Sequence, residues 1–536
     1  MSYFYYFLSS LALVFPTSLG AQASDDLTNH WQHRDAITFS NHFDANDELK
    51  ETAPHHDQFF QAAGNHTEAV CECGDPVGCG DAVGGNGGKK PNPCANSHKD
   101  LFYDNDFSYL KDPCYHGHCL GDCLKLMPVG NEARWGTLDI GGQLRFRYHH
   151  ERGMGQQAGT TRFDPTTNDF LLSRVRLYSN WQVNDCVRFY VEGIDAQVAA
   201  ANSAYIPRPI DQNFGDFLNA FVDLKMLDCA TLRVGRQELL YGNQRLISPL
   251  DWANTRRTFE GAKVMFTSGD WETDIFYTHF VPVLPNELDR ADYDQPFYGC
   301  YATYSGFENF ILQPFYIGYD NNNPPEVGPG GPIPGSGDFS LHTFGMRVNG
   351  GIDDWLFEMI GGPQLGRQSA LGVDQRAGFY TCGIGRNLGA QLPWSPTLWA
   401  YYDYASGNDP GGNWNRFNQL FPLAHKYLGF IDAVQRSNIQ SPNVLLTMKP
   451  AEKWSLLFWY YHFMADQADD IVPAIGGTPP QSLTSRDFGD ELDVLATYRW
   501  GPRSNILFGW SHLWRGDKIL APNDADFVYS QWEVNF

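Results

Sequence analysis

Arginine side chains recur at alternate positions in two early segments of the sequence. In the segment QLRFRYH, Arg145 and Arg147 are separated by one apolar residue, and the segment LLSRVRLYSNW repeats this spacing with Arg174 and Arg176. A guanidinium group binds a carboxylate through two parallel hydrogen bonds, so a row of such groups can hold successive carboxylates of a polyanion. Residues two apart in a β-strand share one face. The spacing therefore predicts a cationic row on one face of several strands.

The same alternation continues along the chain and defines the candidate binding site for an anionic solute. We expect its members to be Arg145, Arg147, Arg174, Arg176, Arg188, Arg233, Arg257, Lys263 and Arg347. Two later arginines, Arg386 and Arg499, extend this face. Carboxylates with the same alternation could pair with some of the cations, and they are Asp139, Glu192, Asp223, Asp403, Glu491, Asp493 and Glu533. Either the opposed charges only hold a water-filled pore open, or the arginines form a ladder of sites that bind and release a passing polyanion.

Histidines form no catalytic pattern that the sequence spacing would support. A hydrolase needs a nucleophile and a base within reach of each other, and His279, His425, His462 and His512 have no serine or acid partner at a convincing spacing. We therefore expect neither an enzyme nor a cofactor. The Asp-rich turn YDNDFSYLKD at 103–112 offers oxygen ligands for calcium, although such a turn is more often only solvated.

Seven of the eleven cysteines lie close together near the start of the chain. They are Cys71, Cys73, Cys79, Cys94, Cys114, Cys119 and Cys123, with His116 and His118 nearby. Their spacing matches no zinc template, so disulfides are favoured over a metal site, and the odd number leaves one thiol over. Cys186 and Cys229 fall in neighbouring predicted turns, where a bridge is conceivable, whereas Cys300 and Cys382 are expected in separate strands.

From Trp135 onward, short segments of alternating residues are separated by turn-forming residues. Such alternation predicts half-buried β-strands. We count eighteen of them, beginning near residues 135, 170, 186, 215, 230, 257, 270, 296, 308, 339, 353, 374, 395, 438, 453, 488, 503 and 526.

The links between these strands are alternately short and long. Short links follow the even-numbered strands, at 183–186, 227–229, 267–270, 350–354, 449–453 and 501–504, and long links follow odd-numbered ones, at 149–169, 199–214, 241–256, 321–338, 407–437 and 467–487. Transmembrane barrels have short periplasmic turns and long outer loops. The sequence therefore predicts an all-β fold, a closed antiparallel transmembrane barrel of about eighteen strands with both ends in the periplasm. Loops such as 407–437 are long enough to fold inward as a plug.

The start of the chain and its composition predict export to the outer membrane of a Gram-negative-type bacterium. The apolar stretch within residues 1–23 is too short to span a bilayer and ends at Ala21-Gln22-Ala23, which predicts a signal peptide, although its first residues carry no Lys or Arg. Residues 24–134 would form a Cys- and Gly-rich periplasmic segment that could contact a periplasmic partner, and residues 135–536 would form the barrel. A net charge of −24 argues against nucleic acid as a partner.

The predicted outward face of the strands is apolar. Phe146 and Tyr148 alternate with the arginines of their strand, and a charge on the lipid face would cost about 2–4 kcal/mol near the midplane. The last segment, DFVYSQWEVNF, places Phe536 toward lipid and Glu533 inward. A terminal aromatic residue resembles the signal by which the outer-membrane insertion machinery recognises its clients, so this machinery and the lipid are expected partners.

Two blocks of the sequence resemble the alginate-export family of outer-membrane β-barrels. The first is FLNAFVDLKMLDCATLRVGRQELLYGNQRLISPLDWANTRRTFEGAKV, with Gly-Arg-Gln at 235–237, Tyr-Gly at 241–242 and Arg-Arg-x-Phe-Glu-Gly at 256–261. The second runs from Tyr402 to Ile439, with Asn408 where an acidic residue is usual. Arg236 falls on the outward face if its strand is regular. Either a bulge at Gly235 resets the register, or the face assignment of this strand is wrong.

The resemblance covers residues 135–536 and implies passive secretion of an acidic, alginate-like polysaccharide through an arginine-lined constriction. It also implies an eighteen-stranded barrel. The constriction is transferred loosely onto Arg145, Arg147, Arg174, Arg176, Arg188 and Arg257. The Cys-rich segment matches no part of the family pattern. A general or nutrient-uptake porin of the same architecture, and a barrel-anchored structural or adhesive surface protein, stay open as alternatives.

Overall fold

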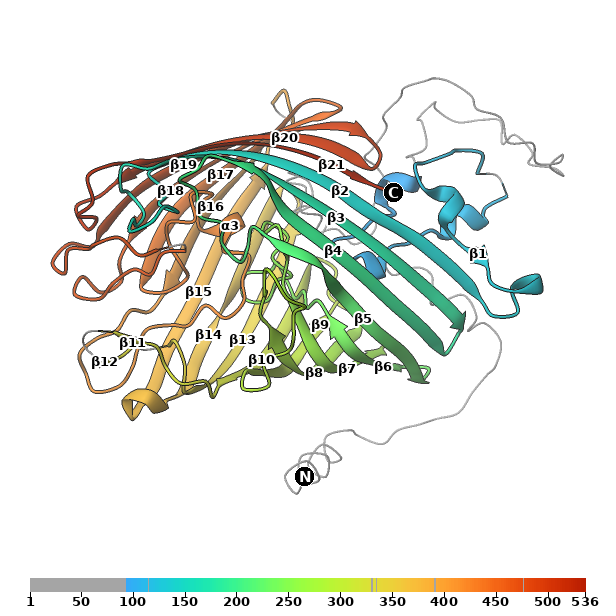
Figure 1. The fold of residues 1–536 in the computed structure, drawn as a ribbon, viewed down its shortest axis with the longest axis horizontal. Coiled ribbons are helices and arrows are strands. Elements are labelled where there is room, and N and C mark those ends of the chain that lie inside the picture. Colours follow the sequence, from blue (N-terminus) through green and yellow to red (C-terminus); the bar gives the residue numbers. More distant parts are fainter. Residues whose placement is uncertain (1–92, 114, 329–330, 334, 390–391, 476) are drawn as a thin grey trace. The chain divides into compact units, whose positions relative to one another are not determined.

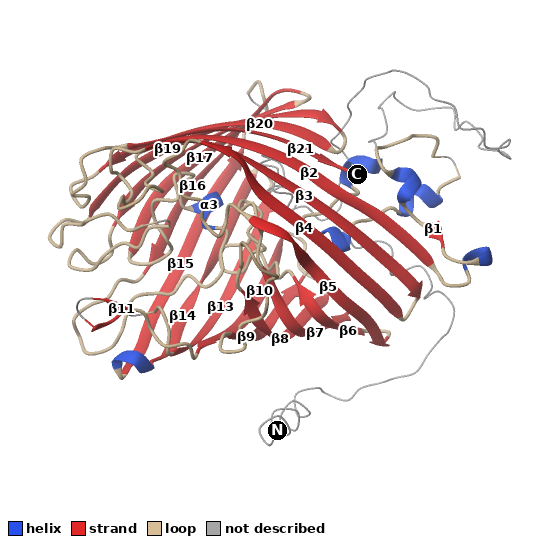
Figure 2. Ribbon diagram, viewed as in Figure 1, coloured by secondary structure: helices blue, strands red, loops and turns tan. Residues whose placement is uncertain are grey.

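The computed structural model describes residues 93–536, except residues 114, 329–330, 334, 390–391 and 476. The predicted signal peptide and Cys71, Cys73, Cys79 and Cys114 lie outside the described residues. The described part forms eighteen long antiparallel strands (Figures 1 and 2). They are β2 (Thr137–Arg152), β3 (Thr167–Asn184), β4 (Val187–Ala201), β5 (Asn213–Leu227), β6 (Ala230–Gln237), β7 (Thr258–Ser268), β8 (Trp271–Val281), β9 (Pro296–Tyr304), β10 (Phe310–Asn321), β13 (Phe339–Ile352), β14 (Trp355–Gln368), β15 (Val373–Asn387), β16 (Thr397–Ala405), β17 (Ile439–Ala451), β18 (Trp454–Met464), β19 (Asp487–Gly501), β20 (Ser504–Arg515) and β21 (Ala525–Asn535).

The sheet closes on itself because the last strand pairs with the first long one. β21 pairs with β2 from Gln143 opposite Asn535 to Arg152 opposite Asp526, and each other long strand pairs with its neighbours in the sequence. Closure gives the backbone groups of every strand a partner, which lipid cannot supply. The predicted closed barrel is confirmed, and each strand begins within three residues of its predicted start.

The remaining elements are short. They are β1 (Met127–Pro128), β11 (Val327–Gly328), β12 (Gly331–Pro332), the helix α3 (Ala424–Tyr427) and the 3-10 turns Pro93–Asn96, Phe102–Asp104, Ser108–Lys111, Asp122–Leu124, Asn131–Ala133 and Ser369–Leu371. No helix in the described part of the chain has the length and apolar character needed to cross a bilayer.

Tight turns and long loops are sorted to opposite ends of the barrel, as the sequence predicts. Only residues 185–186 join β3 to β4, and only residues 502–503 join β19 to β20. At the other end, residues 238–257 join β6 to β7 and residues 406–438 join β16 to β17. Both ends of the barrel chain lie at the tight-turn end, which is the periplasmic end. One link at the long-loop end is short, residues 369–372 between β14 and β15.

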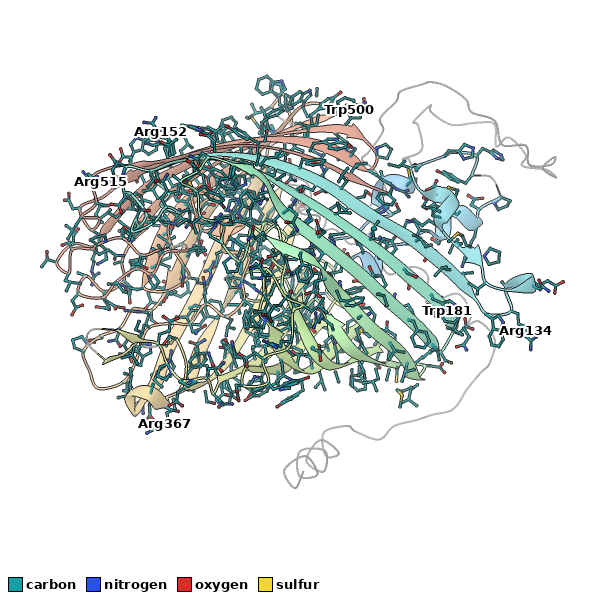
Figure 3. All side chains as sticks on the ribbon, viewed as in Figure 1. Arg134, Arg152, Trp181, Arg367, Trp500 and Arg515 are labelled. Atoms are coloured by element: carbon teal, nitrogen blue, oxygen red, sulfur yellow. A yellow bond between two sulfur atoms is a disulfide. The ribbon has the colours of Figure 1, made fainter. Side chains whose placement is uncertain are left out.

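The two faces of the wall differ in the way that the alternation predicts. Phe146, Val175 and Leu177 are exposed on the outer face, whereas Arg145 and Arg174 are buried within. Figure 3 shows the two rims of the wall, with Trp181 and Trp500 toward the periplasmic end and Arg152, Arg367 and Arg515 toward the other. Trp and Tyr at such levels form the aromatic girdles typical of membrane barrels.

Two of the long loops fold into the lumen and contact each other there. The Phe421 N–H donates to the Leu246 carbonyl over 3.0 Å, and the Ser248 N–H donates to the Phe421 carbonyl over 2.9 Å. The rings of Trp252 and His425 stack with their centroids 3.5 Å apart. The 406–438 loop thus folds inward, as we expected for the 407–437 link. The 238–257 loop lies beside it in the lumen.

The periplasmic mouth is occupied by residues 93–126, which we call the N-terminal plug. The Tyr103 hydroxyl donates to the Glu238 carbonyl over 2.8 Å, and Arg188 donates to the Tyr103 carbonyl over 2.7 Å. A disulfide joins Cys94 to Cys119 inside the plug. The described part of the Cys-rich segment therefore packs within the mouth of the barrel.

Candidate functional site

The predicted cationic face lies in the lumen. Seven of the predicted side chains are buried there and two, Arg188 and Arg257, are partly buried; the buried ones are Arg145, Arg147, Arg174, Arg176, Arg233, Lys263 and Arg347. All are on strands β2, β3, β4, β6, β7 and β13 except Arg257, which directly precedes β7. The strand pleat therefore brings cations from six strands together inside one barrel.

Arg386 is the exception, because the prediction that it faces inward is wrong. On β15, Phe379 and Thr381 are buried, whereas Tyr380 and Ile384 are exposed, and Arg386 has the parity of the exposed pair. Its guanidinium lies over the Trp355 ring, 5.0 Å from the centroid, close to the periplasmic turn. Arginine is tolerated at this rim because its charged end can reach water.

The centre of the site is a carboxylate held by three guanidiniums. Arg145 and Arg174 lie directly opposite each other on β2 and β3, where two like charges would repel. The Asp251 carboxylate, from the 238–257 loop, lies 2.7 Å from Arg174 and 3.5 Å from Arg145. Arg256, from the same loop, completes the group with a direct contact to Asp251. We call these four residues the carboxylate cradle.

Electrostatics in the cradle favours the ionised carboxylate. Burial alone would raise the pKa of Asp251, but Arg174, Arg256 and Arg145 overcome this effect and hold the pKa well below its ordinary value. Arg256 also contacts the Glu238 carboxylate directly, so the excess positive charge of the cradle lies on Arg145 and Arg174, which share Asp251. Guanidiniums in this arrangement can accept a further carboxylate.

Other cations of the site are paired with carboxylates of neighbouring strands or loops. Arg176 lies 2.6 Å from Glu192 and 3.8 Å from Glu238. The remaining pairs are Arg188 and Arg233 with Asp223 at 2.5 and 2.7 Å, Lys263 with Asp274 at 3.0 Å, and Arg347 with Glu358 at 3.0 Å. The predicted carboxylates Glu192 and Asp223 thus lie beside the cationic row instead of forming an opposed wall.

Two arginines of the row have different surroundings. Arg147 stacks on Trp252, with the guanidinium carbon 3.8 Å from the ring centroid, and donates to the Trp252 carbonyl over 2.7 Å. Arg257 donates to the Ser248 and Pro422 carbonyls over 3.3 Å each. Within the described part of the chain, neither forms a salt bridge with a carboxylate. Their charges add to the positive character of the lumen.

Sequence reasoning missed the arginines that the loops bring into the lumen. Arg245 lies 3.2 Å from Asp403 and 3.6 Å from Glu358, and Arg436 lies 2.9 Å from Asp403. Alternation can assign a face only to strand residues, so these positions gave no signal. Arg256 and Arg257 form an Arg-Arg pair in the sequence, but only Arg257 was predicted to belong to the site.

Arg236 stays on the outward side of its strand. β6 pairs with β7 in continuous register, with Arg236 opposite Glu260, so no bulge at Gly235 resets the alternation. Its guanidinium lies 3.7 Å from Asp216 and 3.4 Å from Glu260. Arg236 is therefore not a member of the cationic row.

Three of the four candidate histidines have acid partners that the sequence spacing did not reveal. His462 lies 2.9 Å from Asp490 and His512 lies 2.6 Å from Asp526, each pair directly opposed on adjacent strands. Both pairs are on the outward face, as expected for girdle residues. His425 lies 3.0 Å from Asp432 within the 406–438 loop. Sequence spacing did not predict these carboxylate partners, because they come from other strands or from within a folded loop.

Cysteines and acidic turns form no further site among the described residues. Cys186 and Cys229 are both exposed free thiols, so the bridge between them is not formed, and Cys123 is also free. Cys300 and Cys382 lie in β9 and β15, as expected. In the described ranges, no three His, Cys, Asp or Glu side chains come together as a metal site. In the 103–112 turn, Asp106 accepts a hydrogen bond from the Ser108 N–H.

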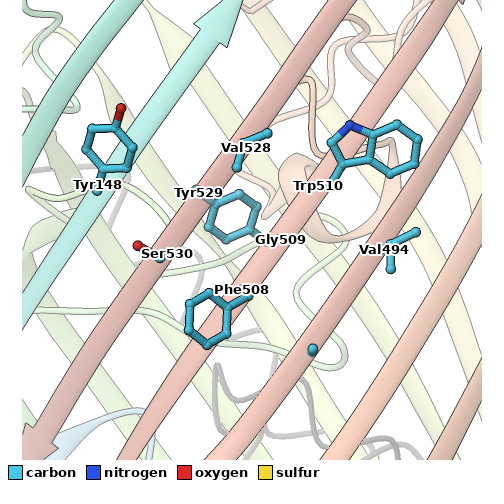
Figure 4. A pocket seen from close by; sticks show the side chains of 9 residues that line it. Tyr148, Val494, Phe508, Gly509, Trp510, Val528, Tyr529 and Ser530 are labelled. Atoms are coloured by element: carbon cyan, nitrogen blue, oxygen red, sulfur yellow. The ribbon is translucent and has the colours of Figure 1, made fainter.

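A hollow on the barrel wall lies outside the lumen, at the closing seam (Figure 4). Its side chains from the outward face include Tyr148, Val494, Phe508, Trp510 and Val528, on β2, β19, β20 and β21. This apolar surface faces lipid and suits an acyl chain, not a charged solute.

A closed barrel with an apolar outer wall and a charged lumen defines an outer-membrane β-barrel protein. The family model described as alginate export matches residues 136–530. The chain belongs to the alginate export family.

One solved porin shares the fold at low sequence identity. A BenF-like porin from Pseudomonas fluorescens Pf-5 is 12% identical, with a TM-score of 0.51 over 74% of this chain and 98% of that one. The outer membrane protein OpdK from Pseudomonas aeruginosa is 14% identical, with a TM-score of 0.48 over 74% of this chain and 99% of that one. No curated protein sequence shows a significant match.

Proposed function

We propose that this barrel is a passive export channel for an anionic, alginate-like polysaccharide. The observation that carries the proposal is the carboxylate cradle, in which Arg145, Arg174 and Arg256 already hold one carboxylate in the lumen. Asp251 shows which chemical group this arrangement accepts. A uronate unit presents the same group, and the family match supports a polysaccharide as the carrier of it.

Transport through such a site requires weak, repeated binding. The cationic row runs over six strands, so a chain of uronates can exchange one guanidinium for the next without ever leaving the row. Most of these sites bind a carboxylate in competition with one of the protein's own, which limits their net affinity. Competition of this kind allows fast release and makes an energy source within the barrel unnecessary.

Planar-bilayer conductance of the purified full chain tests the proposal. We expect anion selectivity and block by uronate oligomers, and about a tenfold higher half-blocking concentration in the variant Arg174→Ala plus Arg176→Ala, because two charge-assisted contacts are lost. Arg386→Ala is the matched control, since it removes an arginine from the outer face. Cation selectivity would exclude the arginine row as the binding site and favour a general porin. Equal block of the Arg174→Ala plus Arg176→Ala variant and the Arg386→Ala control would lead to the same conclusion.

Export itself is tested with liposomes that contain the channel and are loaded with a labelled uronate oligomer. The oligomer should leave faster than a neutral glucan oligomer of the same length, and the Arg174→Ala plus Arg176→Ala variant should lose this preference. Equal rates for both oligomers would favour uptake or leakage of small solutes without selection by charge.

A further inference from the structure

The N-terminal plug places two aromatic rings against a second group of arginines at the periplasmic mouth. Arg176 lies over the Phe102 ring at 3.8 Å from the centroid, and Arg233 lies over the Tyr103 ring at 4.3 Å. Arg188 donates to the Tyr103 carbonyl over 2.7 Å. Two rings and one carbonyl oxygen of the plug thus contact these guanidiniums, which are also paired with Glu192 and Asp223 of the barrel wall.

The barrel wall supplies aromatic faces at the same place. Tyr178, Tyr190 and Phe221 lie on the inward face of β3, β4 and β5 and are buried. The Tyr103 ring packs edge-on against Tyr190 and Phe221, with centroids 5.7 and 5.2 Å away. We call the group Arg176, Arg188, Arg233, Tyr178, Tyr190 and Phe221 the entry subsite.

The chemistry of the entry subsite fits a flat ring that carries an anionic group. The apolar faces of a sugar ring pack on aromatic side chains, which removes apolar surface from water, and guanidiniums beside those side chains bind a carboxylate. A uronate unit combines both features. Phe102 and Tyr103 supply rings and Tyr103 supplies an acceptor oxygen, so the plug imitates part of such a ligand.

The plug is held at the seam where the barrel closes. Lys125 donates to the Ile140 carbonyl over 2.5 Å and to the Phe536 carbonyl over 3.3 Å. Arg503, in the β19–β20 turn, lies 3.0 Å from Asp122 and donates to the Tyr109 hydroxyl over 2.6 Å. These contacts are at the rim, whereas Phe102 and Tyr103 are deeper. The inner part of the plug can therefore be displaced while the rim contacts persist.

The plug also reaches the loop that carries the carboxylate cradle. Arg256 donates to the Asp100 carbonyl over 3.1 Å, and the Tyr103 hydroxyl donates to the Glu238 carbonyl over 2.8 Å. A solute that enters from the periplasm must pass this contact before it meets Asp251. The entry subsite therefore precedes the cradle along the lumen.

We propose that the entry subsite binds the first uronate unit of the cargo, and that Phe102 and Tyr103 occupy it as a built-in competitor until the cargo displaces them. The identity of the ligand rests on the proposed function. The plug thereby keeps the mouth closed to small solutes, and a polyanion long enough to bind several sites opens it.

The test compares the full chain with the variant Phe102→Ala plus Tyr103→Ala in planar bilayers. A uronate oligomer is added first on the tight-turn side and then on the long-loop side, with a neutral glucan oligomer as comparison. We expect the variant to conduct more in KCl and to need about tenfold less uronate for half-block from the tight-turn side only, because the competitor is gone. Leu120→Ala, on an exposed plug residue, is the matched control.

Two further variants keep the test decisive. Tyr103→Leu retains bulk and should give a smaller shift in the same direction if the double variant folds poorly. Tyr190→Leu, added to the double variant, should return the half-blocking concentration toward its original value, because an aromatic face of the subsite is lost. Folding of each variant is checked by its heat-dependent migration on gels.

The outcomes separate this inference from the proposed function. If the oligomer blocks the original chain but Phe102→Ala plus Tyr103→Ala changes neither the conductance nor the half-blocking concentration, the inference is overturned and the export function stands. If no form is blocked from either side, the uronate cargo is wrong and the entry subsite loses its ligand. A shift from the tight-turn side alone supports the inference.

Discussion

At the scale of single residues, the lumen depends on how buried charges are balanced. A buried guanidinium without a partner is strongly unfavourable, and removal of one member of a buried pair typically costs about 3–5 kcal/mol. Glu192 and Asp223 provide such partners from the strands, and Asp251 provides one from a loop. A partner on a loop can move away more easily than one on a strand. If the barrel exports a polyanion as we propose, we expect Asp251 to be the carboxylate that the passing solute replaces first.

Substitution of Asp251 by asparagine tests this difference. The amide keeps the shape of the side chain but removes its charge, so the three guanidiniums of the cradle gain affinity for an external carboxylate. We expect higher anion selectivity and about a tenfold lower half-blocking concentration of uronate oligomer. Bilayer recordings with Asp374→Asn as control, at an exposed position near the outer rim, measure the effect. Unchanged selectivity would show that Asp251 does not compete with the solute.

The sequence predicts single residues well only where a regular strand carries them. The pleat assigned Arg145, Arg174 and Arg347 to the lumen correctly, because neighbours two apart share a face. Arg245 and Arg436 were missed because their loops have no period, and Arg386 was misplaced because the parity of β15 was counted wrongly. The cradle itself could not be predicted, since its carboxylate and one of its arginines come from the 238–257 loop.

At the scale of elements, the two inward loops are held together partly by a buried histidine. The His425 ring stacks on Trp252, and its Nδ1–H donates a hydrogen bond to the Asp432 carboxylate over 3.0 Å. Burial lowers the pKa of His425, and the positive charges of Arg147 and Arg162 lower it further. The Asp432 carboxylate raises the pKa, but the net effect is a pKa below the ordinary value of histidine. Protonation of His425 therefore opposes the packed position of the 406–438 loop.

This opposition predicts that the channel opens more in mild acid. In the released loop, His425 should have the ordinary histidine pKa of about 6.5, and in the packed loop its pKa is lower. The packed state is therefore favoured above about pH 6.5. As the pH falls below this value, the free energy that favours packing decreases by at most about 1.4 kcal/mol per pH unit. Asp432 stays ionised in this range because its pKa lies below its ordinary value. Open probability should rise between pH 7 and pH 5.

Histidine variants show whether His425 is the group responsible. His425→Phe keeps an aromatic ring on Trp252 and should remove the rise in open probability, whereas His512→Phe, on the outer face, should retain it. Single-channel recordings at a series of pH values provide the measurement. A rise that persists in His425→Phe would assign the pH dependence to another group.

The contacts of Phe536 at the end of the chain predict an effect on assembly. The Phe536 N–H donates to the Gly142 carbonyl and the Gly142 N–H donates to the Phe536 carbonyl, each over 3.0 Å. Deletion of Phe536 removes both bonds at the closing seam and the terminal aromatic residue. We expect a smaller fraction of folded, heat-modifiable protein in the membrane and an unchanged conductance in the channels that do insert. Phe536→Tyr should assemble normally, and equal assembly of the deletion would contradict a role in insertion.

At the scale of the whole molecule, the barrel was predictable and its contents were not. Strand number and closure follow from two patterns, the alternation of faces in eighteen segments and the sorting by length of the links between them. The loops and the plug fill the lumen through contacts between residues far apart in the sequence, such as Tyr103 with Glu238 and Leu246 with Phe421. Contacts of this kind leave no period in the sequence, so segment length was the only signal.

Removal of residues 24–126 separates the barrel from its plug. The strand pairing that closes the sheet, from Gln143 opposite Asn535 to Arg152 opposite Asp526, involves no residue of this segment. We therefore expect the shortened chain to fold, with slightly lower stability because the Lys125 and Arg503 contacts at the rim are lost. Heat-dependent migration on gels would report the folded state.

The shortened chain should also conduct more than the full chain and remain anion-selective, because the cationic row belongs to the barrel and its loops. This result would place solute selection in the barrel and closure of the mouth in the plug. A folded barrel with the conductance of the full chain would instead show that the 238–257 and 406–438 loops close the lumen by themselves. If surface adhesion were lost while conductance stayed the same, the barrel would serve mainly as an anchor for residues 24–126.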